Sequence, residues 1–175
     1  MKILITGGCR SGKSRLAQSL AESISPQRWY LATAEAFDDE MEDRIKRHRS
    51  DRDDTWSTIE EPINIAQHFN QPGVVLVDCL TLWLSNQLMK TTDDSEIEMA
   101  IDELVEAYSR SNGPLIMVTN EVGLGIVPMN SMARQFRDHA GRLAQKIALH
   151  SQHVAFCAAG IPLWIKGNPN VENLH

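Results

Sequence analysis

The sequence predicts an α/β fold in which a mainly parallel β-sheet has helices on both faces. Short apolar runs rich in β-branched residues alternate along the chain with segments whose apolar residues recur every three or four positions. Strands that alternate with helices in this way form βαβ units, whose strands run parallel and whose helices cover the sheet. A glycine-rich turn between the first strand and the first helix is the second observation that favours this class.

Six apolar runs predict the strands of this sheet. The first run ends at Gly7, and the third follows the breaker pair Pro72-Gly73. We expect the last strand to lie at an edge, antiparallel to the others. The expected strands cover residues 2–6, 28–34, 74–79, 114–120, 153–160 and 163–167.

Helices are predicted where apolar residues recur at helical spacing. One such stripe runs from Leu16 to Ile24, a second covers 95–110 and a third covers 130–151. The second helix opens with Ser95 and Glu98, a capping-box arrangement that would begin it at the serine. The helical pattern also continues around Trp83, and we expect that indole to pack in the core.

Composition narrows the class of protein. Hydrophobic residues make up 42% and charged residues 23%, with a formal net charge of -6, which disfavours a nucleic-acid partner that needs a broad basic surface. The three cysteines are scattered, no apolar run could span a bilayer, and the first ten residues lack a signal-peptide core. We see no repeat or linker, and therefore expect residues 1–175 to form one domain of a cytoplasmic protein that acts on small molecules.

Residues 7–14, GGCRSGKS, match the phosphate-binding pattern G-x-x-x-x-G-K-[ST] between a predicted strand and a predicted helix. Backbone N–H groups of the loop and the helix N-terminus would face phosphate oxygens. Lys13 would reach the β- and γ-phosphates, and Ser14 would ligate Mg²⁺ together with Asp78, which ends an apolar strand. The context indicates a P-loop NTPase-like three-layer fold and a Mg²⁺-dependent nucleotide enzyme or switch. The loop residues expected to contact the nucleotide are Gly7, Gly8, Cys9, Arg10, Ser11, Gly12, Lys13 and Ser14.

A basic cluster stands out in this acidic chain. Residues 44–52, RIKRHRSDR, hold five Lys or Arg around His48. One interpretation is a solvated helix face with a surface histidine, and the other is a site for a small polyanion. The loop 120–128 also has two interpretations: it is either a ligand-binding loop at the carboxyl end of a strand or an ordinary connection.

Five stretches in order resemble the bifunctional adenosylcobinamide kinase / adenosylcobinamide-phosphate guanylyltransferase family. They are ITGGCRSGKSRLA, ATAEAFDDEM, RIKRHRSDRDDTW, VTNEVGLGIVP and RQFRDHAGRLAQ, and they span most of the chain. The resemblance implies two steps in assembling the nucleotide loop of cobalamin, within a single kinase/guanylyltransferase domain. ATP or GTP would phosphorylate adenosylcobinamide, and GMP from GTP would then be transferred to that phosphate, giving adenosylcobinamide-GDP. The resemblance also implies a homotrimer.

The resemblance further implies a covalent guanylyl-histidine. Family members often carry two adjacent histidines here, of which the second falls on His48 and the first on Arg47. A neutral imidazole can attack the α-phosphorus and expel pyrophosphate, while the surrounding cations offset the charge of the triphosphate. The other nucleotide contacts that the resemblance implies are Thr33, Ala34, Glu35, Arg49, Ser50, Asp51, Arg52, Glu60 and Leu82. Two alternatives remain open, a P-loop kinase of another small alcohol and a nucleotide-dependent switch without covalent chemistry.

Overall fold

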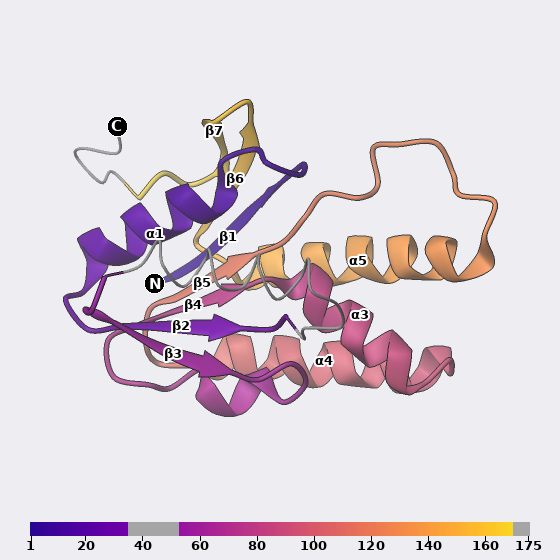
Figure 1. Ribbon diagram of the computed structural model, residues 1–175, viewed down its shortest axis with the longest axis horizontal. Helices are drawn as coiled ribbons and strands as arrows, with labels where there is room; N and C mark the ends of the chain where they lie inside the picture. Colours follow the sequence, from indigo (N-terminus) through magenta and orange to yellow (C-terminus); the bar gives the residue numbers. More distant parts are fainter. Residues whose placement is uncertain (35–52, 170–175) are drawn as a thin grey trace.

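The computed structural model describes residues 1–34 and 53–169 of the chain, and these residues contain one seven-stranded sheet (Figure 1). The strand order is β3-β2-β4-β5-β1-β6-β7, and all neighbours are parallel except β6 and β7. The predicted fold class, including the antiparallel edge strand, is therefore confirmed. The strands are β1 (Lys2–Gly7), β2 (Arg28–Ala32), β3 (Trp56–Glu60), β4 (Val74–Asp78), β5 (Leu115–Val118), β6 (His153–Ala158) and β7 (Ile161–Lys166).

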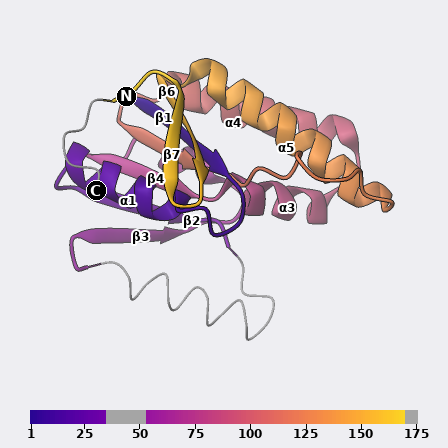
Figure 2. The ribbon, with the colours of Figure 1, turned by 90° about the horizontal axis from the view of Figure 1, so that it is seen from above.

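Helices cover both faces of the sheet, which makes three layers. Figure 2 shows α1 on one side and α4 and α5 on the other. Side chains of β1 alternate between the two cores: Ile3 and Ile5 pack with α1, whereas Leu4 packs with the opposite layer. The helical segments are α1 (Lys13–Ile24), the short 3₁₀ helix η1 (Ile65–His68), α3 (Leu80–Lys90), α4 (Asp94–Arg110) and α5 (Ser131–His150). In the described part of the chain, no helix has the length and apolarity that crossing a lipid bilayer requires.

Two differences from the sequence prediction have a clear physical cause. The first is β3, which the sequence analysis did not predict; it pairs only with β2 at the sheet edge, so its residues are exposed or half-buried and carry no strong apolar pattern. The second is the start of α4, where the predicted Ser95 cap is wrong. Asp93 is the N-cap, and its side chain accepts a hydrogen bond from the Ser95 N–H at 2.8 Å.

A charged layer joins α4 to α5. His139 of α5 is fully buried, with Nδ1 3.0 Å from Glu98 Oε1 and Nε2 2.9 Å from Asp94 Oδ1. Both ring nitrogens therefore face carboxylate oxygens of α4, which are hydrogen-bond acceptors. Hydrogen bonds from Gln135 and then His139 lower the pKa of Asp94, which keeps that carboxylate ionised. Lys146 adds a more exposed ion pair, with Nζ 2.6 Å from Asp102 Oδ1.

The β6–β7 turn contains two residues with positive φ. Ala158 pairs with Ile161, so Ala159 and Gly160 alone form the turn, at φ of 52° and 82°. This backbone matches the right-handed twist of a hairpin but strains a residue that has a Cβ. The turn is also a contact site, because the Gly160 N–H donates to the Ser11 carbonyl at 3.1 Å.

The buried His139 should stabilise the fold more than the half-buried Lys146 of the same layer. We expect His139→Ala to lower the free energy of unfolding by roughly 3 kcal/mol, since two charge-assisted hydrogen bonds and a filled volume are lost. Lys146→Ala should lower it by less than about 1 kcal/mol, because solvent screens its ion pairs. Equilibrium urea denaturation measures both, and equal losses would contradict the role given to the buried imidazole.

The strained turn makes a second, matched pair of variants informative. Ala159→Gly should raise the free energy of unfolding by about 1 kcal/mol, because glycine adopts a positive φ without strain. Ala158→Gly, one residue earlier in the strand, should lower it by roughly 0.5–1 kcal/mol, because there glycine only adds backbone entropy to the unfolded chain. Thermal and urea denaturation that moved both variants in the same direction would refute the strain at Ala159.

Candidate active site

The phosphate loop, residues 7–14, joins the end of β1 to the start of α1. Gly7 has φ of 146°, and a Cβ there would lie 2.3 Å from the Cys157 carbonyl oxygen. Gly12 has φ of 95°, and its Cβ would lie 3.0 Å from the Gly160 Cα. Both positions therefore require glycine. Gly12 also caps α1 without a side-chain hydrogen bond, so the first N–H groups of the helix are left for an anion.

Lys13 lies inside this loop and is only 6% exposed. Its Nζ donates to the Gly8 carbonyl at 2.6 Å and lies 3.4 Å from Ser11 Oγ. Burial lowers the pKa of Lys13, and the neighbouring acidic groups of Cys79 and Asp78 oppose that shift. A phosphate bound in the loop would favour the charged ammonium, which is the form that holds a triphosphate.

The predicted metal ligands come from two elements at the same edge of the sheet. Ser14 stands in the first turn of α1, and the half-buried Asp78 ends β4, which β5 separates from β1 in the sheet. The Tyr30 hydroxyl donates to Asp78 Oδ2 at 2.9 Å, which fixes one carboxylate oxygen. A hydroxyl and a carboxylate suit a hard cation such as Mg²⁺. Among residues 1–34 and 53–169, no three His, Cys, Asp or Glu side chains gather into a metal-binding group, so phosphate oxygens and water would have to complete the shell.

Thr33 fastens the end of β2 to the start of α3. Its hydroxyl donates to the Cys79 carbonyl at 2.8 Å and accepts from the Cys79 N–H at 2.9 Å. The Asn86 amide donates to the Thr33 carbonyl at 2.8 Å. Because the buried hydroxyl is engaged within the protein, it positions the β2–α3 region, and its contact with a nucleotide stays a prediction.

The remaining predicted residues fall elsewhere. Leu82 is half-buried in the first turn of α3, and Ala34 directly follows Thr33. Glu60 is exposed at the end of β3, where it pairs with Ala32 of β2. The predicted residues therefore form two groups. The phosphate loop and Asp78 lie at the ends of β1 and β4, on either side of β5. Thr33, Ala34 and Glu60 lie at the ends of β2 and β3. Outside the described residues lie Glu35, His48, Arg49, Ser50, Asp51 and Arg52, with the rest of the basic cluster.

Sequence analysis left open whether the loop 120–128 that follows β5 binds a ligand, and it assigned no role to Asn120 or Glu121. The Glu121 N–H donates to the Gly7 carbonyl at 2.9 Å, which places the start of the 120–128 loop against the phosphate loop. The Asn120 amide nitrogen lies 3.3 Å from Thr81 Oγ1, near the start of α3. The sequence indicates only that these residues follow a strand, where ligands often bind. Which residues lie next to them depends on the order of strands in the sheet, which the sequence pattern does not give.

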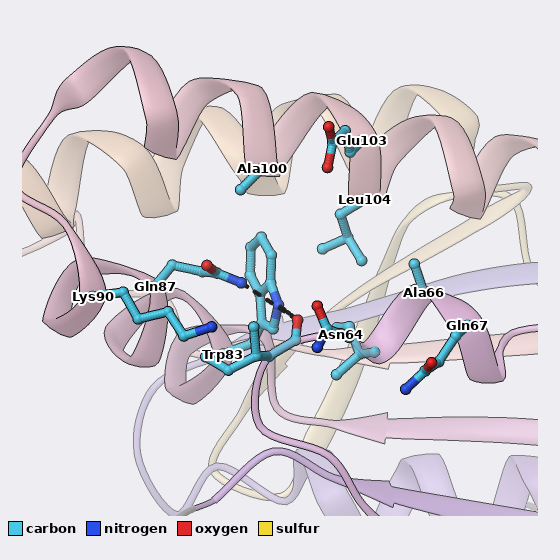
Figure 3. Close-up of a pocket in the computed structure, with 11 residues that line it drawn as sticks. Asn64, Ala66, Gln67, Trp83, Gln87, Lys90, Ala100, Glu103 and Leu104 are labelled. Atoms are coloured by element: carbon cyan, nitrogen blue, oxygen red, sulfur yellow. Dashed lines mark hydrogen bonds between the residues drawn. The ribbon is translucent and has the colours of Figure 1, made fainter.

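A separate pocket lies between η1, α3 and α4, with a volume of about 330 Å³ (Figure 3). Trp83, 2% exposed as expected for a core indole, donates from Nε1 to the Ile63 carbonyl at 2.8 Å beside this pocket. Gln87 and Lys90 line the same side. None of the lining residues belongs to the predicted nucleotide contacts, so this pocket is distinct from the phosphate loop.

Structural likeness supports the P-loop NTPase type of fold. A prototypical ATPase from the type III secretion system of pathogenic bacteria superposes with a TM-score of 0.55 at 12% identity, covering 89% of this chain and 50% of that one. A protein from Pyrococcus horikoshii OT3 gives a TM-score of 0.53 at 10% identity, covering 97% of this chain and 87% of that one. At such low identity these likenesses concern the fold alone.

Two bacterial proteins share far more sequence identity with this chain than these solved structures do. The bifunctional adenosylcobalamin biosynthesis protein CobP of Pseudomonas aeruginosa is 43% identical over 173 residues, covering 97% of this chain and 99% of the relative. The bifunctional adenosylcobalamin biosynthesis protein CobU of Escherichia coli is 38% identical over 182 residues, covering 95% of this chain and all of the relative. The family model for cobinamide kinase / cobinamide phosphate guanyltransferase matches residues 3–165. The chain belongs to the cobinamide kinase / cobinamide phosphate guanyltransferase family.

Proposed function

We propose that this chain, as one domain over residues 1–175, phosphorylates adenosylcobinamide and then guanylylates the product. The first step places the γ-phosphate of ATP or GTP on the aminopropanol hydroxyl. The second moves GMP from GTP onto that phosphate, giving adenosylcobinamide-GDP and pyrophosphate. The observation that carries the proposal is the phosphate loop with buried Lys13 beside Asp78, in a chain whose family has these two activities.

In the phosphoryl-transfer step, the loop residues bind and orient the triphosphate. Backbone N–H groups of the loop and the α1 N-terminus would surround its oxygens, and Lys13 would neutralise charge that develops toward the leaving group. Ser14 and Asp78 are the residues proposed to hold Mg²⁺, which supplies charge neutralisation on the phosphates when bound. Tyr30 positions Asp78 for that role through its hydroxyl.

In the guanylyl-transfer step, His48 is the proposed nucleophile. An imidazole nitrogen forms a bond to the α-phosphorus of GTP, and the bond from that phosphorus to the leaving oxygen breaks, which releases pyrophosphate. An oxygen of adenosylcobinamide phosphate then attacks the same phosphorus and frees the imidazole. The nearby cations would offset the charge of the triphosphate. The family resemblance supports further nucleotide contacts at Thr33, Ala34, Glu35, Arg49, Ser50, Asp51, Arg52, Glu60 and Leu82.

We also propose that the protein is a homo-oligomer, a trimer by the family resemblance, in the cytoplasm. Large apolar side chains stand exposed on the loop after β5, including Ile126 at 95% and Met129 at 99%. Exposed apolar clusters of this kind mark protein–protein contacts. Cys9, Cys79 and Cys157 are free thiols, which suits a reducing compartment. Sedimentation equilibrium would test the trimer.

The guanylyl-histidine can be tested by labelling. Incubation with Mg²⁺ and GTP labelled at the α-phosphorus, followed by denaturation, should leave a protein-bound label that is acid-labile and alkali-stable. His48→Ala should abolish it. Absence of label in the wild type would favour a plain kinase or a switch, and label that survived in His48→Ala would place the nucleophile elsewhere.

Loss of the buried ammonium should weaken triphosphate binding. We expect Lys13→Ala to raise the Kd for GTP about 10- to 100-fold, because a charge-assisted hydrogen bond is worth roughly 1.5–3 kcal/mol. Arg15→Ala, which removes an exposed cation of the same helix, is the control and should change the Kd less than about twofold. Isothermal titration calorimetry measures both, and equal effects would contradict the specific role of Lys13.

A further inference from the structure

Glu121 lies where the loop after β5 meets the phosphate loop. The parallel ladder between β5 and β1 continues past the strand ends: the Thr119 N–H donates to the Ile5 carbonyl at 3.0 Å, and the Glu121 N–H donates to the Gly7 carbonyl at 2.9 Å. Gly7 is the first residue of the phosphate loop. The backbone of Glu121 is therefore fixed beside the phosphate-binding turn.

The half-buried side chain of Glu121 has one engaged and one free oxygen. Oε1 accepts a hydrogen bond from the Gly123 N–H at 2.5 Å. Arg137 of α5 donates from Nη2 to the Gly123 carbonyl at 2.6 Å. The helix α5 therefore fixes the position of Gly123, and Gly123 in turn fixes the carboxylate of Glu121. Within the residues that the structure describes, Oε2 of Glu121 takes part in no hydrogen bond, which leaves it able to accept a proton.

The other carboxylates at this edge are committed elsewhere or lie farther along the sheet. Asp78 accepts from Tyr30 and is the proposed metal ligand. Glu61 accepts from the backbone N–H groups of Ile63 and Asn64. Glu60 ends β3, four strand positions from β1, which is about 19 Å at ordinary strand spacing. Of these four carboxylates in the described part of the chain, Glu121 is the one whose backbone bonds directly to the phosphate loop.

We propose that Glu121 is the general base of the phosphoryl-transfer step, an inference that rests on the function proposed above. The hydroxyl oxygen of adenosylcobinamide forms a bond to the γ-phosphorus as its proton passes to Oε2 of Glu121. The bond between the γ-phosphorus and the β–γ bridging oxygen breaks, and its electron pair leaves with the nucleoside diphosphate. Guanylylation needs no such base, because its nucleophile is a neutral imidazole and its acceptor is already a phosphate.

Glu121→Gln separates the chemical role from the structural one. The glutamine keeps a carbonyl oxygen for the Gly123 N–H but offers no carboxylate to take the proton. We expect kcat of the kinase step to fall about 100-fold or more. The α-phosphorus label on the protein should stay within about threefold of wild type. Glu121→Asp should recover part of the kinase rate, and Glu106→Gln, which alters a glutamate paired with Arg110 on α4, should change neither reaction.

Each other outcome overturns the proposal. A kinase rate in Glu121→Gln within threefold of wild type would exclude Glu121 as the base. Loss of both reactions together would show that Glu121 only maintains the loop. A wild-type protein that forms the guanylyl label but transfers no γ-phosphate to adenosylcobinamide would instead refute the kinase half of the proposed function, and the base assigned to it.

Discussion

The parallel pairing of β5 with both β1 and β4 is the constraint on which the site depends. Val118 of β5 lies opposite Ile5 on one side and opposite Asp78 on the other. Parallel neighbours in register end at one edge, so the phosphate loop, Asp78 and Glu121 meet there although the chain separates them widely. A shift of register would move these three groups apart together, because each leaves its strand within a few residues of this pairing.

Buried polar groups tie the helices to that edge. Lys13 bonds within the loop that begins α1, Thr33 joins β2 to α3, and His139 joins α5 to α4. Each lies almost fully out of water and each has partners at hydrogen-bond distance, as buried polar groups require. The α4–α5 layer extends to the site itself, since Arg137 of the same helix holds the turn at Gly123. Helix packing and site geometry are therefore coupled through hydrogen bonds as well as apolar contacts.

Local patterns in the sequence predicted the parts of the fold that they control. The buried strands were visible as apolar runs, and the phosphate loop as glycine, lysine and serine at fixed spacing between a strand and a helix. The edge strand β3 was missed because a strand with one neighbour buries few side chains. The predicted cap of α4 was wrong by two residues, because Asp93 and Ser95 are both good caps and only the geometry separates them.

Glu121 could not be assigned a partner, since its contact with Gly7 follows from a strand order that no local pattern encodes. The role of His48 still rests on sequence, because that residue lies outside the described part of the chain.

The β6–β7 turn has a consequence for engineering this protein. Exposed two-residue turns are usually chosen for inserting epitope tags or for opening a chain in circular permutation, because their side chains touch little. Here the backbone of Gly160 supports Ser11, and its Cα limits the space at Gly12. An insertion at this turn would therefore disturb nucleotide binding, although it replaces no residue that holds a nucleotide. The outermost hairpin of the sheet supports the backbone of the phosphate loop.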